Sequence, residues 1–278
     1  MSIKLTKASS YTIEELTEAY NQTRVDYMVP MPMNAARLRE YVHIYDIDLE
    51  QSLVAVDGDQ IIGLGMLAVR KDRTWITRLG LLANTRGKGI GRLVMEGLLA
   101  NSEALKIPLT MLEVIKGNVP AHNLFRSLGF EETEELLILR RAPKETDASR
   151  SKVFQMDRGE IIFMLNNRPV PAAWTNQTES LAQVKGISGF NLYTPEGGHG
   201  WLVFQRTLFN LSRLVFGTEH GNPVDIMREL LHHLHSEYPE VDTYTENISA
   251  DSPHLPALEE LGYIETFRRV HMFRSFST

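Results

Sequence analysis

The chain contains no cysteine among its 278 residues. It can therefore form no disulfide bond, and it has no thiol to act as a nucleophile. It also has no apolar run approaching the roughly 20 residues needed to span a bilayer, and its first residues lack the apolar core of a signal peptide. These absences predict a cytoplasmic protein. They also make chance the better interpretation of the glycosylation sequons at Asn176 and Asn247.

An excess of positive charge is missing as well. The net charge at pH 7 is −6, so a broad nucleic-acid-binding surface is not expected. The hydrophobic content of 43% and the charged content of 23% are ordinary for a globular protein. A chain of this length can form one large domain or two ordinary ones.

A glycine-rich turn is the most informative feature that is present. The apolar stretch 76–82 predicts a strand, and the amphipathic run that begins at Ile90 predicts a helix. The segment between them reads Asn84-Thr-Arg-Gly-Lys-Gly-Ile-Gly-Arg92. Such a turn directs several backbone N–H groups toward one point, and the helix dipole adds positive potential there. We therefore expect a phosphate or diphosphate ligand.

The glycine spacing excludes two common nucleotide-binding loops. No Ser or Thr follows Gly87-Lys88, as a P-loop would require, and glycines at 87, 89 and 91 do not give the spacing of a dinucleotide-binding loop. The residues instead match R-x-x-G-x-G, from Arg86 to Gly91. This motif closely resembles the acetyl-CoA-binding motif of the GNAT acyltransferases.

A second block strengthens the resemblance. Leu112-Glu-Val114 is followed by Asn118-Val-Pro-Ala-His-Asn-Leu-Phe125 and then by Leu128-Gly-Phe130. This order is similar to the family's N-x-x-A-x-x-L-Y…G-F segment, and the two blocks together cover residues 50–140. The resemblance implies an α/β (α+β) fold with a mixed, mostly antiparallel central sheet flanked by helices.

The apolar periodicity independently predicts an α/β layout with a mixed sheet. A capping box at Thr12-x-x-Glu15 predicts the start of the first helix, and Asp57-Gly58 predicts a hairpin turn. The expected helices are 12–28, 35–45, 90–105 and 118–128, and the expected strands are 52–56, 60–67, 75–82, 109–114 and 135–140.

The second half of the chain looks like a divergent copy of the first half. A polar, non-periodic stretch at 143–152 predicts a linker between domains at 1–142 and 153–278. Asn247-Ile-Ser-Ala250 is similar to the segment that begins at Asn118. An unrelated second α/β domain is the alternative.

The counterpart of the glycine loop in this second half, residues 217–224, has lost the glycine spacing. Pro223 removes an N–H group where phosphates would need one, and Glu219 adds a repulsive charge. We therefore expect a degenerate GNAT-like domain that does not bind acetyl-CoA.

The resemblance also implies where the cofactor lies. The backbone of the strand before the loop would accompany the pantetheine arm, with an N–H group near Leu81 facing the thioester oxygen. The glycine loop would surround the diphosphate, because glycine permits close approach. The implied acetyl-CoA-binding residues are Leu79, Gly80, Leu81, Arg86, Gly87, Lys88, Gly89, Ile90, Gly91, Arg92, Asn118 and Phe125.

Several of these residues have simpler alternatives. Lys88 and Arg92 could be solvated surface cations, and Asn118 could be a helix N-cap. Phe125 departs from the family pattern, which often has a tyrosine here as a general acid. Either another group protonates the leaving thiolate or it leaves unaided, which a thiol pKa near 8.5 permits. His122 is a candidate for that group, and a surface position is the simpler interpretation.

Acetyl transfer to an amine also needs a proton acceptor. A lysine-like amine has a pKa near 10.4, so its deprotonation at pH 7 costs roughly 4–5 kcal/mol. Glu113 ends an apolar strand where some family members carry a general base, which makes it the candidate catalytic residue. The alternative is that Glu113 pairs structurally with an arginine such as Arg78.

His232, His233 and His235 raise the question of a metal site. Residues 232 and 235 share a helix face, but no carboxylate or fourth ligand is evident from the sequence. We expect a solvated helix face and no metal.

The function implied by the resemblance is an acetyl-CoA-dependent N-acetyltransferase, in which a primary amine attacks the thioester directly. A non-catalytic acyl-CoA sensor or pseudo-enzyme is one alternative, and a regulatory role for the second half is another. The expected partners are acetyl-CoA and an unidentified amine, with no nucleic acid and no membrane; homodimer formation stays open. Family members modify small amines, antibiotics, polyamines, peptides and proteins, so the acceptor cannot be read from the motifs.

Overall fold

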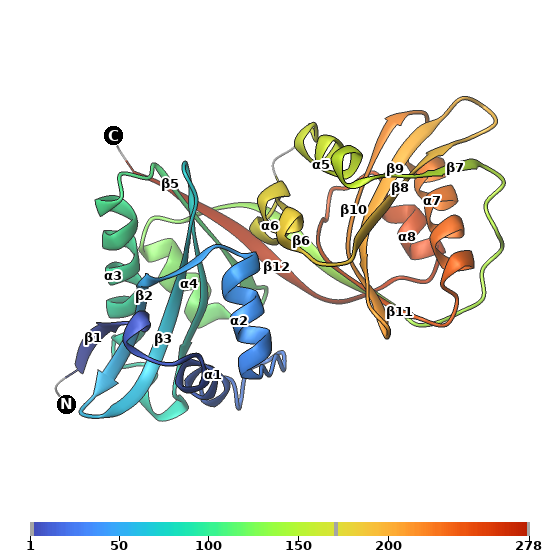
Figure 1. Ribbon diagram of the computed structural model, residues 1–278. Helices are drawn as coiled ribbons and strands as arrows, with labels where there is room; N and C mark the ends of the chain where they lie inside the picture. Colours follow the sequence, from blue (N-terminus) through green and yellow to red (C-terminus); the bar gives the residue numbers. More distant parts are fainter. Residues whose placement is uncertain (1–2, 170–171, 277–278) are drawn as a thin grey trace. The chain divides into compact units, whose positions relative to one another are not determined.

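The structure is a computed structural model that describes residues 3–169 and 172–276 (Figure 1). The chain forms two compact units. Unit 1 contains the residues up to Thr133 and those from His271 onward, and unit 2 contains Glu134–Val270. Relative to the expected division at 143–152, each half therefore contributes a terminal strand segment to the other unit. Every strand presents the same backbone donors and acceptors at a sheet edge, so the local sequence pattern does not specify this exchange.

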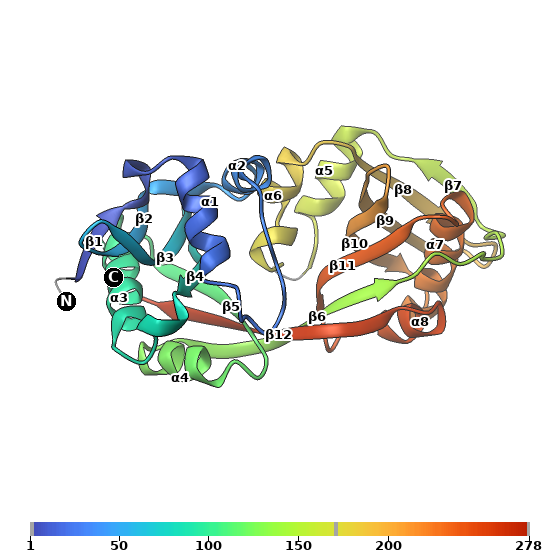
Figure 2. The same ribbon diagram turned by 90° about the horizontal axis from the view of Figure 1, so that it is seen from below.

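The sheet of unit 1 has the strand order β1-β2-β3-β4-β5, and the end of β12 lies beside β5. The pairs are antiparallel from β1 to β4, whereas β4 and β5 are parallel. Figure 2 shows α1 and α2 on one face of this sheet and α3 and α4 on the other. The elements are β1 Ile3–Lys7, α1 Ile13–Gln22, α2 Ala35–Ile44, β2 Ile47–Asp57, β3 Gln60–Val69, β4 Thr74–Leu81, α3 Ile90–Ala104, β5 Leu109–Ile115 and α4 Val119–Ser127.

Local signals explain where the helices of unit 1 begin. Thr12 caps α1 by accepting a hydrogen bond from the Glu15 N–H at 3.2 Å, and the Glu15 carboxylate accepts from the Thr12 N–H at 2.7 Å. Asn34 caps α2 through its side chain, which accepts a hydrogen bond from the Arg37 N–H. The helix α1 ends at Gln22, earlier than the periodicity predicts, and turns follow it. This early end brings the turn residues next to β4.

The core of unit 1 lies around β3, which is buried along most of its length. Leu64 and Met66 are at most 1% exposed, and Val94 and Leu98 of α3 are fully buried. Burial of each such side chain contributes about 1.5–3 kcal/mol, so the packing of α3 against the sheet fixes the position of the glycine loop that precedes it.

The sheet of unit 2 has the strand order β6-β11-β10-β9-β8-β7, and the first part of β12 lies beside β6. Here β10 and β11 are parallel, and Leu202, Leu230 and Leu234 lie in the core. The elements are β6 Glu131–Arg141, β7 Lys152–Gln155, α5 Arg158–Asn166, α6 Thr178–Gln183, β8 Ile187–Tyr193, β9 His199–Arg206, β10 Asn210–His220, α7 Pro223–Glu237, β11 Asp242–Ser249, α8 Leu255–Glu260 and β12 Ile264–Ser275.

The same backbone irregularity occurs in both units. Arg78 in β4 and Arg213 in β10 each have φ 55, and each lies at a register shift against the preceding strand. Each bulged strand is also the one that forms the parallel pair of its sheet. A left-handed arginine is uncommon, so its recurrence at matching places confirms the two similar halves and the mixed, mostly antiparallel sheets expected from the sequence.

Candidate functional site

A cavity of about 880 Å³ lies in unit 1 beside β4, the glycine loop and α4. It forms where β4 and β5 diverge, because β4 pairs with β5 at its first two residues and then bulges at Arg78. The predicted cofactor residues that line it are Leu79, Gly80, Leu81, Arg86, Gly87, Gly89, Gly91, Arg92 and Asn118. The remaining three lie elsewhere: Lys88 is exposed, while Ile90 and Phe125 are buried.

The glycine loop has the backbone conformation that glycine favours. Gly87 and Gly89 have φ values of 74 and 81, and a Cβ built on either would meet nothing within 4 Å. Gly89 is also the N-cap of α3 and provides no side-chain cap. The first N–H groups of α3 therefore face the cavity side without a capping side chain, as an anion-binding loop requires.

The α4 side of the cavity is organised by Asn118. This residue caps α4 by accepting from the Ala121 N–H at 3.4 Å, and its Nδ2 donates to the Tyr27 hydroxyl at 3.4 Å. Phe125 packs edge-to-face against Phe130 in the core. His122 pairs with Glu132 at 3.0 Å, so it is directed at that carboxylate.

The turn after α1 forms one wall of the cavity and contacts the predicted cofactor residues. Arg24 donates to the Leu79 carbonyl at 2.9 Å and stacks on the Tyr27 ring at 4.0 Å. Asp26 accepts two hydrogen bonds from Arg86, at 2.6 and 2.7 Å. These bonds hold the pKa of Asp26 below its usual value. The sequence patterns contain no sign of this wall.

Glu113 lies outside this cavity lining, with a side chain that is only 5% exposed. Its Oε2 accepts a hydrogen bond from Trp75 Nε1 at 2.7 Å, and its Oε1 lies 4.0 Å from His271 Nε2. Among the described residues, Oε1 has no hydrogen-bond partner.

Arg78 is engaged elsewhere. It donates to the Tyr20 hydroxyl at 3.2 Å and lies over the Tyr41 ring at 4.2 Å. Tyr41 itself is hydrogen-bonded to Thr77 at 2.8 Å, and burial raises its pKa, so its hydroxyl keeps its proton.

Sequence reasoning missed the partners of Glu113. Trp75 lies at the start of the strand that feeds the glycine loop and could have been found from strand alternation. His271 has no local signal, because it reaches unit 1 through the end of β12.

The equivalent place in unit 2 is occupied by its own side chains. Strand β10 continues to His220, so the loop before α7 shrinks to two residues, shorter than the stretch 217–224 expected from the sequence. The Asn222 side chain accepts from the Val224 and Asp225 N–H groups, at 2.9 and 3.3 Å. The Asn222 side chain therefore caps N–H groups at the start of α7, whereas the corresponding groups of α3 have no side-chain cap.

The α8 side of unit 2 is closed as well. His254, and not Asn247, stands at the N-cap position that Asn118 has in α4. The similarity of the segment at Asn247 to that at Asn118 is therefore misleading, because Asn247 lies within β11. His254 accepts or donates a hydrogen bond with Thr218 at 2.9 Å and packs on Phe216, and its burial lowers its pKa.

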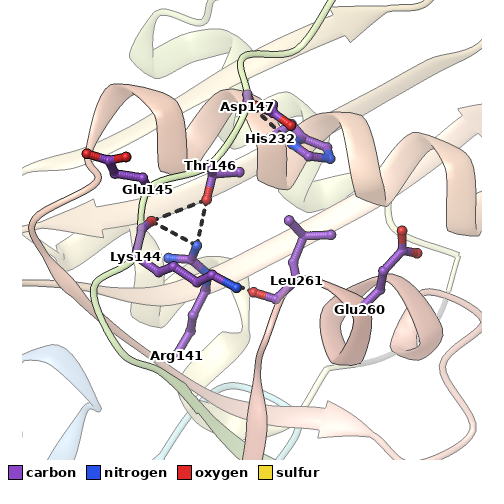
Figure 3. Close-up of a pocket in the computed structure, with 8 residues that line it drawn as sticks. All are labelled: Arg141, Lys144, Glu145, Thr146, Asp147, His232, Glu260 and Leu261. Carbon is purple, nitrogen blue, oxygen red and sulfur yellow. Dashed lines mark hydrogen bonds between the residues drawn. The ribbon is translucent and has the colours of Figure 1, made fainter.

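A second cavity, of about 410 Å³, lies in unit 2 around the segment that follows β6 (Figure 3). Arg141 lines this cavity, and its guanidinium group is already bonded to the protein. It donates to the Leu261 carbonyl at 2.8 Å and to Thr146 Oγ1 at 2.6 Å. Figure 3 shows His232 beside Asp147, whose carbonyl lies 2.9 Å from Nδ1. These contacts fasten the polar segment to α7 and α8.

The three histidines of α7 have separate surroundings. His232 contacts Asp147, His233 packs on the Phe190 ring, and His235 bonds to the Tyr263 hydroxyl at 3.0 Å. The expected solvated face is wrong for His235, which is fully buried. Within residues 3–169 and 172–276, no group of three His, Asp or Glu side chains could hold a metal ion. No helix in these ranges is long and apolar enough to cross a bilayer.

The chain is similar to a known family in sequence and to solved structures in fold. Residues 13–130 match the model of the acetyltransferase (GNAT) family. No curated protein matches the chain by sequence.

Solved structures match over the whole chain. A GCN5-related N-acetyltransferase from Sphaerobacter thermophilus has a TM-score of 0.72 at 11% identity, over 98% of this chain and 95% of its own. A tandem GNAT protein from the clavulanic acid biosynthesis pathway has a TM-score of 0.67 at 12% identity, over 100% and 99%. A GCN5-related N-acetyltransferase from Anabaena variabilis has a TM-score of 0.60 at 14% identity, over 98% of this chain and 72% of its own. These similarities confirm the tandem fold that the sequence predicts.

Proposed function

Residues 13–130 match the model of the GNAT acetyltransferase family, and on that premise we propose that the chain transfers the acetyl group of acetyl-CoA to a primary amine. The proposal is carried by one observation: both motif blocks, which are about 30 residues apart, line a single cavity in unit 1. Its volume of about 880 Å³ lies in the range of ordinary ligand sites.

The cavity offers suitable partners for each part of the cofactor. The N–H groups at the start of α3, together with Arg86 and Arg92, would hold the diphosphate. The edge of β4 from Leu79 to Leu81, which does not pair with β5, would lie along the pantetheine arm. Because the Leu79 and Leu81 carbonyls already accept from Arg24 and Arg86, the arm would bond to the backbone N–H groups of this edge. An N–H group near Leu81 would face the thioester oxygen and stabilise the oxyanion.

Glu113 would receive the proton of the attacking amine. Its Oε2 is held by the indole of Trp75, which fixes the orientation of the carboxylate. Its Oε1 is buried without a hydrogen-bond donor among the described residues, a state that costs about 1–3 kcal/mol. An ammonium group or a water molecule at Oε1 would remove that cost, which favours a ligand there. The CoA thiolate would leave without help from Phe125, which cannot donate a proton.

A non-catalytic acyl-CoA sensor is the second candidate. The burial of Glu113 and the phenylalanine at 125 favour it, since both remove groups from direct contact with reactants.

Substitution Glu113→Gln separates the two functions. We expect calorimetry to show acetyl-CoA binding in both the wild type and the variant. Release of free CoA thiol over a broad panel of amines should occur with the wild type and fall at least 100-fold in the variant. Glu132→Gln, a carboxylate paired with His122, is the control and should keep full turnover. Binding without turnover in the wild type would establish the sensor instead.

A further inference from the structure

The end of β12 brings a histidine to the candidate base. His271 is the first residue of the C-terminal segment that belongs to unit 1, and it lies beyond the residues matched by the family model. Its Nε2 lies 4.0 Å from Glu113 Oε1, and the two side chains are 2% and 5% exposed.

The position of His271 is held from both sides. Its carbonyl accepts a hydrogen bond from Thr133 Oγ1 at 3.1 Å, and its ring packs on that of Phe273 at 4.5 Å. The Glu113 carboxylate is held in turn by Trp75. A small side-chain rotation would bring His271 Nε2 and Glu113 Oε1, now 4.0 Å apart, within hydrogen-bond distance, and a water molecule could also connect them.

The pair lies in low-dielectric surroundings. The charged or titratable groups near the pair include Arg78 on β4, Tyr41 on α2 and Tyr45 directly after α2. The rings of the two tyrosines lie within 6.2 Å of the Trp75 ring. A buried carboxylate that takes up and releases protons needs a neighbour that carries the compensating charge. His271 Nε2 is the group that approaches the Oε1 atom of Glu113.

We propose that His271 is a positioning residue for Glu113 and the second proton acceptor of the transfer. This inference rests on the proposed acetyltransferase function. The amine arrives as an ammonium ion, and Glu113 takes its first proton and passes it to His271 Nε2. The free amine then forms a C–N bond with the thioester carbon, the C–S bond breaks, and its electron pair leaves on the CoA sulfur. The second nitrogen proton goes to Glu113. The pair thus holds both protons until they return to solvent.

The first test requires no cofactor and no acceptor. The imidazole C–H signals of the whole chain are recorded by NMR at one fixed pH, and the His271 signal is identified by its loss in His271→Gln. We expect Glu113→Gln to shift the His271 signals at constant pH, because a carboxylate 4.0 Å from Nε2 is replaced by a neutral amide. Glu132→Gln is the matched control: it should move the His122 signal and leave that of His271 unchanged. A His271 signal that does not move in Glu113→Gln overturns the inference.

The second test is kinetic and uses acetyl-CoA with the panel amine that releases most thiol. His271→Gln should lower kcat at least 10-fold, keep KM for acetyl-CoA within twofold and alter the pH profile of kcat; His122→Gln should change none of these. Unchanged kcat overturns the inference. If His271→Gln does not fold, the His271 signal is identified instead by its through-space contact with the Phe273 ring, whose centroid lies 4.5 Å away, and the comparison of Glu113→Gln with the wild type still decides. Failure of the wild type to bind acetyl-CoA in calorimetry would refute the proposed function itself, whereas intact binding with an uncoupled His271 refutes this inference alone.

Discussion

Asp26 and Arg86 form an ion pair with two hydrogen bonds at the candidate cofactor cavity, at 2.6 and 2.7 Å. Arg86 also donates to the carbonyls of Thr23 and Leu81. The arginine that opens the glycine loop is therefore engaged by protein groups in this structure. A diphosphate that binds here has to compete with Asp26 for the guanidinium.

Substitution Asp26→Asn should therefore strengthen CoA binding. The pair is exposed, and exposed pairs contribute about 1 kcal/mol or less, so we expect Kd to fall by about two- to fivefold. Calorimetry with CoA at low salt measures this. Asp242→Asn, which breaks a comparable exposed pair with Arg140 in unit 2, should leave Kd unchanged. Weaker binding by Asp26→Asn would mean that the turn after α1 supports the cofactor and does not compete with it.

Substitution Gly89→Val should abolish CoA binding. The φ of 81 at Gly89 is strained for valine, and the side chain would project into open space where the diphosphate is expected. Gly58→Val is a matched control, because Gly58 has φ 61 and equally open surroundings but lies in the β2–β3 turn. Both variants should lose about 1–2 kcal/mol of stability. Only Gly89→Val should raise Kd, by at least 100-fold; equal affinities in the two variants would remove the glycine loop from the site.

The chain should bind one CoA. In α3 the N-terminal N–H groups have no side-chain cap, whereas in α7 the Asn222 side chain takes two of them. His254 with Thr218 occupies the side that Asn118 lines in unit 1. We expect a calorimetric stoichiometry of one per chain and no change in it on Asn222→Ala. A stoichiometry of two would refute the degenerate state proposed for unit 2.

The parts of the fold that follow from the sequence are those with local causes. The capping box at Thr12, the glycine turn at 87–91 and the strand–helix alternation each depend on neighbours within a few residues. The repeat could also be recognised, although the loop boundaries in unit 2 were misjudged because β10 continues to His220.

The remainder depends on contacts between residues distant in the sequence. The wall made by Arg24 and Asp26 forms because α1 ends early, and His271 meets Glu113 only through the strand exchange. Ion pairs join distant residues in the same way: Asp46 pairs with Arg70, and Glu50 with Lys7. No periodicity or spacing records such long-range contacts.

The buried His235 should make unit 2 sensitive to mild acid. Burial lowers its pKa to about 3, and it bonds to Tyr263 at 3.0 Å. In the unfolded chain the pKa is near 6.5, so between about pH 6.5 and 3 the unfolded state binds more protons than the folded state. Stability is therefore lost as pH falls through this window, and at pH 5 the loss from this residue is about 2 kcal/mol.

The substitution His235→Gln tests that account. The variant should be less stable than the wild type at pH 7, because the packing and the bond to Tyr263 are altered, but its melting temperature should fall less on going to pH 5. A loss of about 2 kcal/mol corresponds to roughly 7 °C for a unit of this size, and the variant should lack about that much of the pH-dependent decrease. His43→Gln, at an exposed position on α2, should keep the wild-type dependence. Equal decreases in His235→Gln and the wild type would mean that other groups, such as the half-buried His254, set the acid sensitivity.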